Sequence, residues 1–221
     1  MNPDNSHIKR DLEDIIRKYL SRGKVIILYG ARRVGKTTLS QKIFSPADEV
    51  LYLSCDQSRI QEQIRPDSLA LRSVIGNYKN IIFDEAQYLS DSGLILKILI
   101  DNFPEKNIIA SGSSSFDLAH KLTEPLTGRH YKFLLYPFLL SEIVRTVPST
   151  DRLFHLEESL IFGTYPEVFK LKTNEEKIRN LQTLIDAYLY KDILNFNLVK
   201  NSQKVKELLI VLALQIGNEV S

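Results

Sequence analysis

The stretch Gly30-Ala31-Arg32-Arg33-Val34-Gly35-Lys36-Thr37 decides the fold, because it matches the Walker A pattern G-x-x-x-x-G-K-[ST] without a break. It follows a short β-branched run, VIILY at residues 25–29, and precedes a stretch that can be helical. Glycines in such a turn let the backbone curl so that its N–H groups face inward as a cradle for an anion. A strand, a glycine-containing turn and a helix in this order therefore predict a phosphate-binding loop.

The loop also predicts the contacts that a nucleotide would make. We expect the backbone from Gly30 to Thr38 to surround the phosphates, with the positive end of the following helix beneath them. Lys36 can reach the β- and γ-phosphates, and the hydroxyl of Thr37 can ligate Mg²⁺. The alternative is an ordinary strand–turn–helix that happens to contain these residues, and the order of the elements argues against it.

A second motif supplies the carboxylates that this chemistry needs. Asn80-Ile81-Ile82-Phe83-Asp84-Glu85 is an apolar run ending in two acids, the pattern of a Walker B strand. An aspartate at the end of such a strand can hold the hydration shell of Mg²⁺, and we assign this role to Asp84. The neighbouring Glu85 can polarise a water in line with the γ-phosphate. Gln87 has two interpretations, a side chain that orients this water or a cap of the loop.

Two further candidates are a serine and an arginine. The run Ser111-Gly112-Ser113-Ser114-Ser115 follows a predicted strand, so a hydroxyl there can sense the γ-phosphate or act as the N-cap of a helix. We choose Ser113 as the sensor. Arg129 precedes another strand, and we expect it at the active edge of the sheet, where it would supply transition-state charge in cis or in trans. The alternative for Arg129 is a surface salt bridge.

Strand and helix patterns alternate around these motifs up to about residue 140, and helical patterns alone follow. Such alternation indicates an α/β fold with a mainly parallel sheet. We therefore divide the chain into an α/β core at residues 1–140 and a helical, lid-like subdomain at residues 141–221. The expected strands are 24–29, 50–53, 81–84, 108–111 and 131–135. The expected helices are 8–20, 37–44, 69–78, 92–103, 116–122, 141–147, 151–162, 174–194 and 202–216.

The composition is that of an ordinary globular protein of 221 residues, 43% hydrophobic and 25% charged. The 29 Lys and Arg residues nearly balance the 27 Asp and Glu residues, so the net charge of +2 commits the chain neither to nucleic acid nor to an anionic membrane. Cys55 is the only cysteine, which excludes an internal disulfide and fits a reducing compartment. No apolar run approaches the roughly 20 residues of a membrane span, so we expect a cytoplasmic protein.

Other classes of phosphate-loop protein fit less well. A GTPase would carry a guanine-reading Asn-Lys-x-Asp pattern, which is absent from the sequence. A helicase would need a second motor domain, and a small-molecule kinase usually lacks an acid at the position of Glu85. Three interpretations stay open: an ATPase, a slow nucleotide-dependent switch that regulates a partner, and an ATPase that loads or remodels nucleic-acid machinery. The basic pairs Lys9-Arg10 and Arg32-Arg33 give the third interpretation slight support.

The motifs together resemble a family of prokaryotic AAA-type ATPases with the signatures GPRRVGKTTL, DEIQ, GS, GR…PLSFxEF and GGYPE. The matching segments are 30–39, 81–89, 111–115, 126–129, 136–142 and 163–167, with Ala31 in place of the usual proline and Thr164 in place of a glycine. The resemblance implies five strands in the order 5-1-4-3-2 and ATP with Mg²⁺ as ligands. It implies that Lys36 and Thr37 bind phosphate and metal and that Asp84 holds the metal. It also implies that Glu85 activates water, that Ser113 is sensor-like and that Arg129 is finger-like.

The resemblance also bears on the end of the chain. Family members usually continue into a winged helix and a nuclease-like domain, and a stretch similar to QIGNEVS at residues 215–221 opens the winged helix. We therefore expect the sequence to be a fragment that is truncated at the start of a winged helix, with the missing domain or a protein partner responding to the nucleotide. The alternative is a complete short protein whose last helix packs on the body. A homo-oligomer and a nucleic-acid partner stay open, and we expect no membrane contact.

Overall fold

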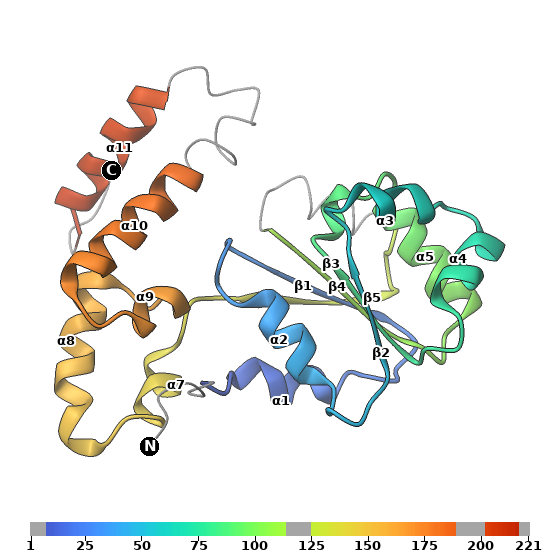
Figure 1. Ribbon diagram of the computed structural model, residues 1–221, viewed down its shortest axis with the longest axis horizontal. Helices are drawn as coiled ribbons and strands as arrows, with labels where there is room; N and C mark the ends of the chain where they lie inside the picture. The colour runs from blue at the N-terminus through green and yellow to red at the C-terminus, as the bar shows by residue number, and fades with distance from the viewer. Residues whose placement is uncertain (1–7, 114–124, 189–201, 217–221) are drawn as a thin grey trace. The chain divides into compact units, whose positions relative to one another are not determined.

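The computed structural model describes residues 8–113, 125–188 and 202–216. Strands and helices alternate through most of its first compact unit, Met1–Pro166 (Figure 1). The strands are β1 (Val25–Gly30), β2 (Val50–Ser54), β3 (Asn80–Asp84), β4 (Asn107–Ser113) and β5 (His130–Leu135). The helices among them are α1 (Asp11–Arg17), α2 (Lys36–Ile43), α3 (Ser58–Gln63), α4 (Ser68–Ile75), the short 3-10 helix η1 (Ala86–Tyr88) and α5 (Ser92–Asn102).

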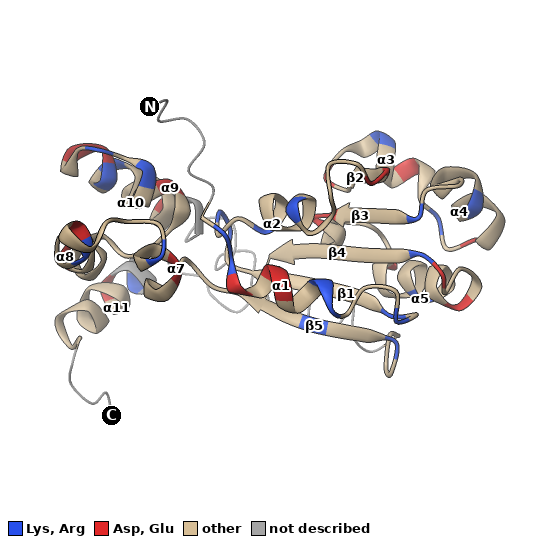
Figure 2. Ribbon diagram, turned by 90° about the horizontal axis from the view of Figure 1, so that it is seen from below, with Lys and Arg blue, Asp and Glu red and all other residues tan. Residues whose placement is uncertain are grey.

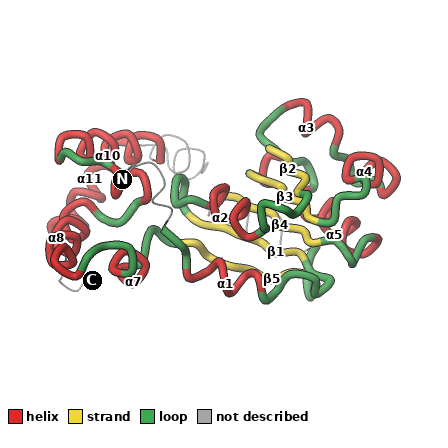
Figure 3. Tube along the Cα trace, turned by 60° about the horizontal axis from the view of Figure 1, so that its bottom comes forward, coloured by secondary structure: helices red, strands yellow, loops and turns green. Residues whose placement is uncertain are grey.

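The five strands form one sheet in the order β2-β3-β4-β1-β5 (Figure 3). Every neighbouring pair is parallel. Read from β5 to β2, this is the predicted order 5-1-4-3-2, so the predicted α/β fold is confirmed. β1 lies between β4 and β5, with Ile26 opposite Ile109 on one side and Tyr131 on the other. The loop that follows β1 therefore leaves the sheet beside the ends of two other strands.

The central strands are apolar on both faces because helices cover both faces. Val25 and Ile27 of β1 pack in one apolar cluster, while Ile26 and Leu28 pack in another, as the two-residue period of a strand requires. Helices α4 and α5 contribute side chains to the first cluster, and helices α1 and α2 contribute to the second. Two-sided burial explains why these strands are continuous apolar runs in the sequence.

All five strands run in the same direction, so their carboxyl ends lie along one edge of the sheet. β1 ends at Gly30, β3 ends at Asp84 and β4 ends at Ser113. The phosphate loop, the acidic strand end and the serine turn, which lie far apart in the sequence, therefore meet at this edge. Ligands of open parallel sheets bind at the carboxyl ends of the strands.

Helices follow β5. The first unit continues with α7 (Leu140–Val144), the 3-10 helix η2 (Ser149–Asp151) and α8 (Arg152–Phe162). Helices α9 (Pro166–Lys170), α10 (Asn174–Tyr188) and α11 (Ser202–Leu214) begin at or after the division between the first unit and the second, Glu167–Ser221. This division lies later in the chain than the proposed domain boundary at residue 140, which rests on the change of sequence pattern alone.

Eight of the nine expected helices have a counterpart among the described residues, and two observed α-helices, α3 and α9, were not among those expected. Helix α3 was not predicted, and it buries none of its residues, so no apolar period marks it in the sequence. The expected helix at residues 116–122 lies outside the described residues. Helix α1 has acids in its first turn and Arg17 in its last, which complements the helix dipole (Figure 2). Within the described part of the chain, no helix combines the length and the apolar character that crossing a membrane requires.

Candidate functional site

The predicted phosphate loop begins where β1 ends, and its two glycines are needed for different reasons. A Cβ atom built on Gly30 would lie 2.3 Å from the carbonyl oxygen of Leu135 on β5, so a larger residue would force the backbone to move. Gly35 is the N-cap of α2 and has a φ of 96°, in the left-handed region that favours glycine. Gly30 allows a close approach of two strands, and Gly35 allows the turn into the helix.

Lys36 begins α2, and its side chain folds back on the loop. Its Nζ donates hydrogen bonds to the carbonyl oxygens of Gly30 at 3.1 Å and Ala31 at 2.9 Å. The residue is only 5% exposed, and a lysine is rarely so buried without partners. The positive charge is thus held against the first two residues of the loop.

The carboxylate of Asp84 accepts hydrogen bonds from three hydroxyl groups. Thr37 Oγ1 donates to Asp84 Oδ2 at 2.7 Å, and Tyr52 Oη donates to the same oxygen at 2.6 Å. The hydroxyl of Ser111 donates to the other oxygen, Oδ1. Asp84 is buried, so donors from α2, β2 and β4 compensate for the water that its charge has lost.

Thr37 and Asp84 together suit a hard divalent cation. Both residues offer oxygen, which is the kind of ligand that Mg²⁺ prefers, and their direct hydrogen bond shows that the two atoms can approach one ion. Mg²⁺ typically takes one or two protein oxygens and completes its shell with water and phosphate oxygens. The residues present at this edge therefore fit the metal that accompanies a nucleotide.

Glu85 occupies a strained turn directly after β3. Its φ of 53° and ψ of 46° are left-handed, which is uncommon for a residue with a side chain. Strain of this kind concentrates at functional sites, where the surrounding structure maintains it. The Oε2 of Glu85 accepts a hydrogen bond from Nε2 of Gln87, whose own Oε1 is buried and has no partner among the described residues. Gln87 therefore orients the carboxylate of Glu85.

Two serines of β4 lie near the loop. Ser113 ends the strand opposite Gly30 and is buried, so it stands beside the first residue of the loop. Ser111, two residues earlier and on the same face of the strand, is the serine that contacts Asp84. The sensor role of Ser113 stays a prediction, and Ser111 joins it as a second hydroxyl at the site.

Arg129 does not lie at the edge that carries the loop. Its carbonyl oxygen accepts a hydrogen bond of 2.9 Å from the backbone nitrogen of Val25, at the start of β1. Because β1 and β5 are parallel, Val25 and Gly30 mark opposite edges of the sheet, about 16 Å apart. The guanidinium instead pairs with Asp101, with 2.7 Å between Nε and Oδ1. The expected position of Arg129 at the active edge is therefore wrong, and so is a role in cis, whereas a role in trans stays a prediction.

Sequence reasoning missed Tyr52, Arg10 and Glu142, and it chose Ser113 rather than Ser111 within the serine run. Ser111 lies inside the buried run of β4, and a hydroxyl in such a run is a signal that could have selected it. Tyr52 is an exposed residue of the half-buried strand β2, which offers no such signal. Arg10 and Glu142 form a buried ion pair between residues 132 positions apart, with 3.0 Å between Nε and Oε2, and no local pattern announces it. Because Arg10 is buried, the pair Lys9-Arg10 is not an exposed basic patch.

Burial changes the acidity of two groups beside Asp84. Partial burial raises the pKa of Tyr52, and the hydrogen bond to Asp84 raises it further. The phenol therefore stays protonated and donates a hydrogen bond to Asp84. Burial also raises the pKa of the Cys55 thiol to about 12, and the neighbouring charge of Asp84 adds to this effect. Both groups therefore stay protonated at neutral pH, and Asp84 is the acceptor among them.

Two family profiles match the chain. A family described as an AAA domain matches residues 22–144, which is more than half of the chain. A second family, described as a domain of unknown function (DUF8612), matches residues 153–221. The first match covers the whole sheet, the phosphate loop and the strand that ends at Asp84.

Curated relatives come from archaea and mycobacteria. The uncharacterized protein MJ1544 of Methanocaldococcus jannaschii is 27% identical over 97% of this chain and 51% of its own length. MJ1637 of the same organism is 30% identical over 82% of this chain and 46% of its own length. The uncharacterized protein Rv2008c of Mycobacterium tuberculosis is 29% identical over 84% and 40%. The chain spans about half the length of the curated relatives that it matches.

Solved structures with some similarity include two proteins. A DNA replication initiation factor is 17% identical, with a TM-score of 0.46 over 84% of this chain and 62% of that chain. The Walker-type ATPase PABY2304 of Pyrococcus abyssi is 18% identical, with a TM-score of 0.48 over 83% of this chain and 73% of that chain.

Proposed function

The chain belongs to the AAA domain family, and we propose that it binds ATP together with Mg²⁺ and hydrolyses the bond between the β- and γ-phosphates. The observation that carries this proposal is the hydrogen bond of 2.7 Å between Thr37 Oγ1 and Asp84 Oδ2. Thr37 belongs to the phosphate loop and Asp84 ends a different strand, so the contact joins the two motifs that ATP chemistry requires in one place.

The loop supplies the phosphate contacts. Gly35 and the first residues of α2 present backbone N–H groups at the positive end of a helix, where phosphate is favoured. Lys36 would exchange its carbonyl partners for phosphate oxygens, because an ammonium group prefers a charged acceptor to a neutral one. These contacts form with the bound nucleotide and therefore govern affinity as well as rate.

Thr37 and Asp84 would hold the metal. Mg²⁺ would supply positive charge that offsets the negative charge of the bound phosphates. Tyr52 and Ser111 fix the orientation of the Asp84 carboxylate by donating to it, so that its remaining lone pairs face a defined direction. Two hydroxyls from strands outside the phosphate loop would thus orient the metal site.

Glu85 would accept the proton of the attacking water. Its carboxylate follows Asp84 by one residue, and Gln87 donates to one of its oxygens. A general base needs a fixed direction and a free lone pair, and this hydrogen bond provides the first. Ser113 beside Gly30 would sense the γ-phosphate, and Arg129 would act only on the site of a second copy.

Coupling of the nucleotide state to a protein partner or to a further domain belongs to the same proposal. It is supported by relatives that extend to about twice the length of this chain. The winged-helix and nuclease-like parts implied by the sequence signatures would be found in that additional length.

Thermal unfolding with MgATP and MgGTP, combined with steady-state turnover, tests the proposal. A ligand at 100 times its Kd adds about 2.7 kcal/mol to the free energy of unfolding, which a melting curve detects readily. We expect MgATP to stabilise the parent protein and Lys42→Ala, a control on the exposed end of α2, but to lose most of its effect on Lys36→Ala. Equal stabilisation by MgGTP would contradict the adenine preference, and no stabilisation by either nucleotide would refute the function.

A further inference from the structure

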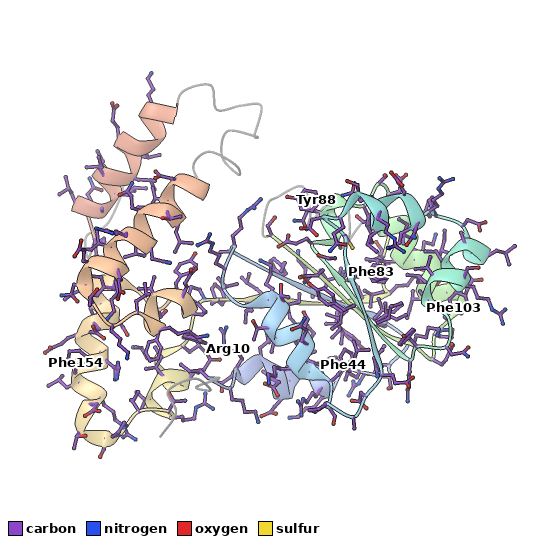
Figure 4. The ribbon with its side chains drawn as sticks, viewed as in Figure 1. Arg10, Phe44, Phe83, Tyr88, Phe103 and Phe154 are labelled. Atoms are coloured by element: carbon purple, nitrogen blue, oxygen red, sulfur yellow. The ribbon has the colours of Figure 1, made fainter. Side chains whose placement is uncertain are left out.

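The buried guanidinium of Arg10 joins segments that lie far apart in the sequence (Figure 4). Arg10 immediately precedes α1 and is 5% exposed. Its nitrogens donate to Glu142 Oε2 at 3.0 Å, to the carbonyl oxygen of Val34 at 3.1 Å, and to the carbonyl oxygens of Tyr136 at 2.6 Å and Pro137 at 3.2 Å. One side chain therefore contacts the phosphate loop, the chain leaving β5 and the helix α7.

Glu142 is the counterion that keeps Arg10 in this position. It is 2% exposed, and besides Arg10 it accepts hydrogen bonds from the backbone nitrogens of Asp11 at 2.8 Å and Leu139 at 2.9 Å. Burial lowers the pKa of the Arg10 guanidinium, and Glu142 opposes that effect. An arginine remains charged in proteins, so the pair is a buried ion pair, and removing either charge would leave the other uncompensated.

The contact with Val34 has a consequence for the loop. A peptide bond is planar and trans, so the C=O of Val34 and the N–H of Gly35 point in opposite directions. With the carbonyl directed at Arg10, the Gly35 N–H points in the opposite direction within the same plane, away from Arg10. Gly35 has no side chain and a φ of 96°, so little within the residue restrains this plane. Arg10 supplies the restraint.

We propose that Arg10, held by Glu142, is a positioning residue that orients the Gly35 amide of the phosphate loop and links occupancy of the loop to the segment 136–142. The proposal rests on the proposed function, because the Gly35 N–H is one of the donors offered to phosphate. The guanidinium holds Val34 and the carbonyls of Tyr136 and Pro137 at once, so a shift of the loop displaces the same group that fixes the exit of β5. Such a link is reciprocal. If nucleotide binding changes the conformation of residues 136–142, then a change in the conformation of residues 136–142 must also change the affinity for nucleotide.

Backbone hydrogen exchange without nucleotide tests the restraint directly. Arg10→Gln should accelerate exchange in the peptides covering residues 30–39 and 136–144 by about tenfold, because both segments lose a charged donor. Glu142→Gln should do the same to a lesser degree. The matched control is Arg145→Gln, since Arg145 also joins α7 to α1, through an ion pair with Asp11, but 56% of its side chain is exposed. That variant should exchange like the parent in residues 30–39, whereas in residues 136–144 it loses only the exposed hydrogen bond from Arg145 to the Ser141 carbonyl.

Nucleotide affinity and turnover then separate positioning from catalysis. Arg10→Gln should weaken the affinity for a fluorescent ATP analogue by about tenfold or more, the loss expected when a charged hydrogen bond no longer orders the loop. At saturating MgATP the turnover number should fall much less, because Arg10 touches neither the metal ligands nor Glu85. Arg10→Lys keeps the charge but replaces the planar guanidinium by a single ammonium group. Its affinity for the ATP analogue should therefore lie between those of the parent protein and Arg10→Gln.

The link is read by hydrogen exchange at saturating concentrations of a non-hydrolysable ATP analogue. In the parent and in Arg145→Gln, the analogue should slow exchange in residues 30–39 and also in residues 136–144. In Arg10→Gln, residues 30–39 should still respond and residues 136–144 should not. A segment 136–144 that ignores the analogue in the parent, or responds equally in Arg10→Gln, would overturn the link.

Failure of the proposed function and failure of this inference are distinguishable. If the parent binds no nucleotide, the function is refuted, and the exchange rates without nucleotide still decide whether Arg10 restrains the loop. A folded Arg10→Gln with parent-like exchange in residues 30–39 would overturn the positioning role. If Arg10→Gln does not fold, Arg10→Lys and Glu142→Gln provide the same comparison, and parent-like affinity and exchange in both would overturn the proposal.

Discussion

Replacing Gly30 by alanine tests the geometry of the loop more sharply than removing a charged side chain does. The new Cβ would lie 2.3 Å from the carbonyl oxygen of Leu135, whereas real Cβ contacts essentially never fall below 3.0 Å. The obstacle is backbone, in the register pair that joins the ends of β1 and β5. The end of β1 or of β5 must therefore move by at least 0.7 Å, the difference between 3.0 and 2.3 Å, and no side-chain rotation can provide this movement.

The size of the effect follows from this contact. Overpacking costs about 1–3 kcal/mol, and a rigid backbone neighbour places Gly30→Ala at the upper end, at about 3 kcal/mol. For a chain of this size, that corresponds to a fall in melting temperature of roughly 6–12 °C. Gly128→Ala is the control, because nothing lies within 4 Å of a Cβ there and only its φ of 76° opposes alanine. The control should lose about 1 kcal/mol, or roughly 2–4 °C.

Thermal unfolding followed by circular dichroism measures both variants, and the fluorescent ATP analogue measures the loop. Gly30→Ala should also bind the analogue more weakly, because the displaced strand end carries the first residue of the loop. Gly128 lies beyond the opposite edge of the sheet, next to Arg129, so its variant should bind like the parent. A Gly30→Ala protein that melts no lower than Gly128→Ala would refute the reasoning.

Two other predictions concern a carboxylate and a thiol. Glu85→Gln should keep its affinity for MgATP and hydrolyse it about 10²–10⁴-fold more slowly in single-turnover experiments, because it removes a base that contacts only water; hydrolysis at the parent rate would assign the base elsewhere. Cys55, with its pKa raised to about 12, should resist iodoacetamide at pH 8 in the folded protein and react after unfolding in urea, as mass spectrometry can show. Since the folded state disfavours the thiolate, the contribution of Cys55 to stability is complete below pH 9 and declines as the pH rises from 9 to about 12.

The sheet could be predicted from the sequence because β1 and β3 each carry two independent signals, an apolar run and a motif at its end. β1 and β3 are uninterrupted apolar runs, as burial on both faces requires, and each ends in residues with distinctive chemistry. The order of the strands was not contained in these runs and came from the resemblance to a family. Helix α3 could not be predicted, because a helix that buries no residue has no apolar period to detect.

The site could be predicted along the chain but not across the sheet. Thr37 and Asp84 were assigned to one metal from motif chemistry, and their side chains are in direct contact. Tyr52 was missed because its role depends on the pairing of β2 with β3, and β2 carries no motif of its own. The sequence alone does not say which of Ser111 and Ser113 contacts Asp84, because both lie on one face of the same strand. Contact with Asp84 depends on the strand register, which places Ser111 within reach.

The error at Arg129 lies in geometry rather than in sequence. The strand after it was predicted at residues 131–135 and is observed at His130–Leu135, so the element was known to within one residue. In a parallel sheet, the residue before a strand and the residue after it lie at opposite edges, and only the second edge carries the phosphate loop. The same rule applied to the other end of β5 points to Tyr136 and Pro137, whose carbonyls Arg10 holds together with that of Val34. Strand direction therefore places Arg129 away from the phosphate loop, whereas Arg10, which precedes α1, contacts the loop at Val34.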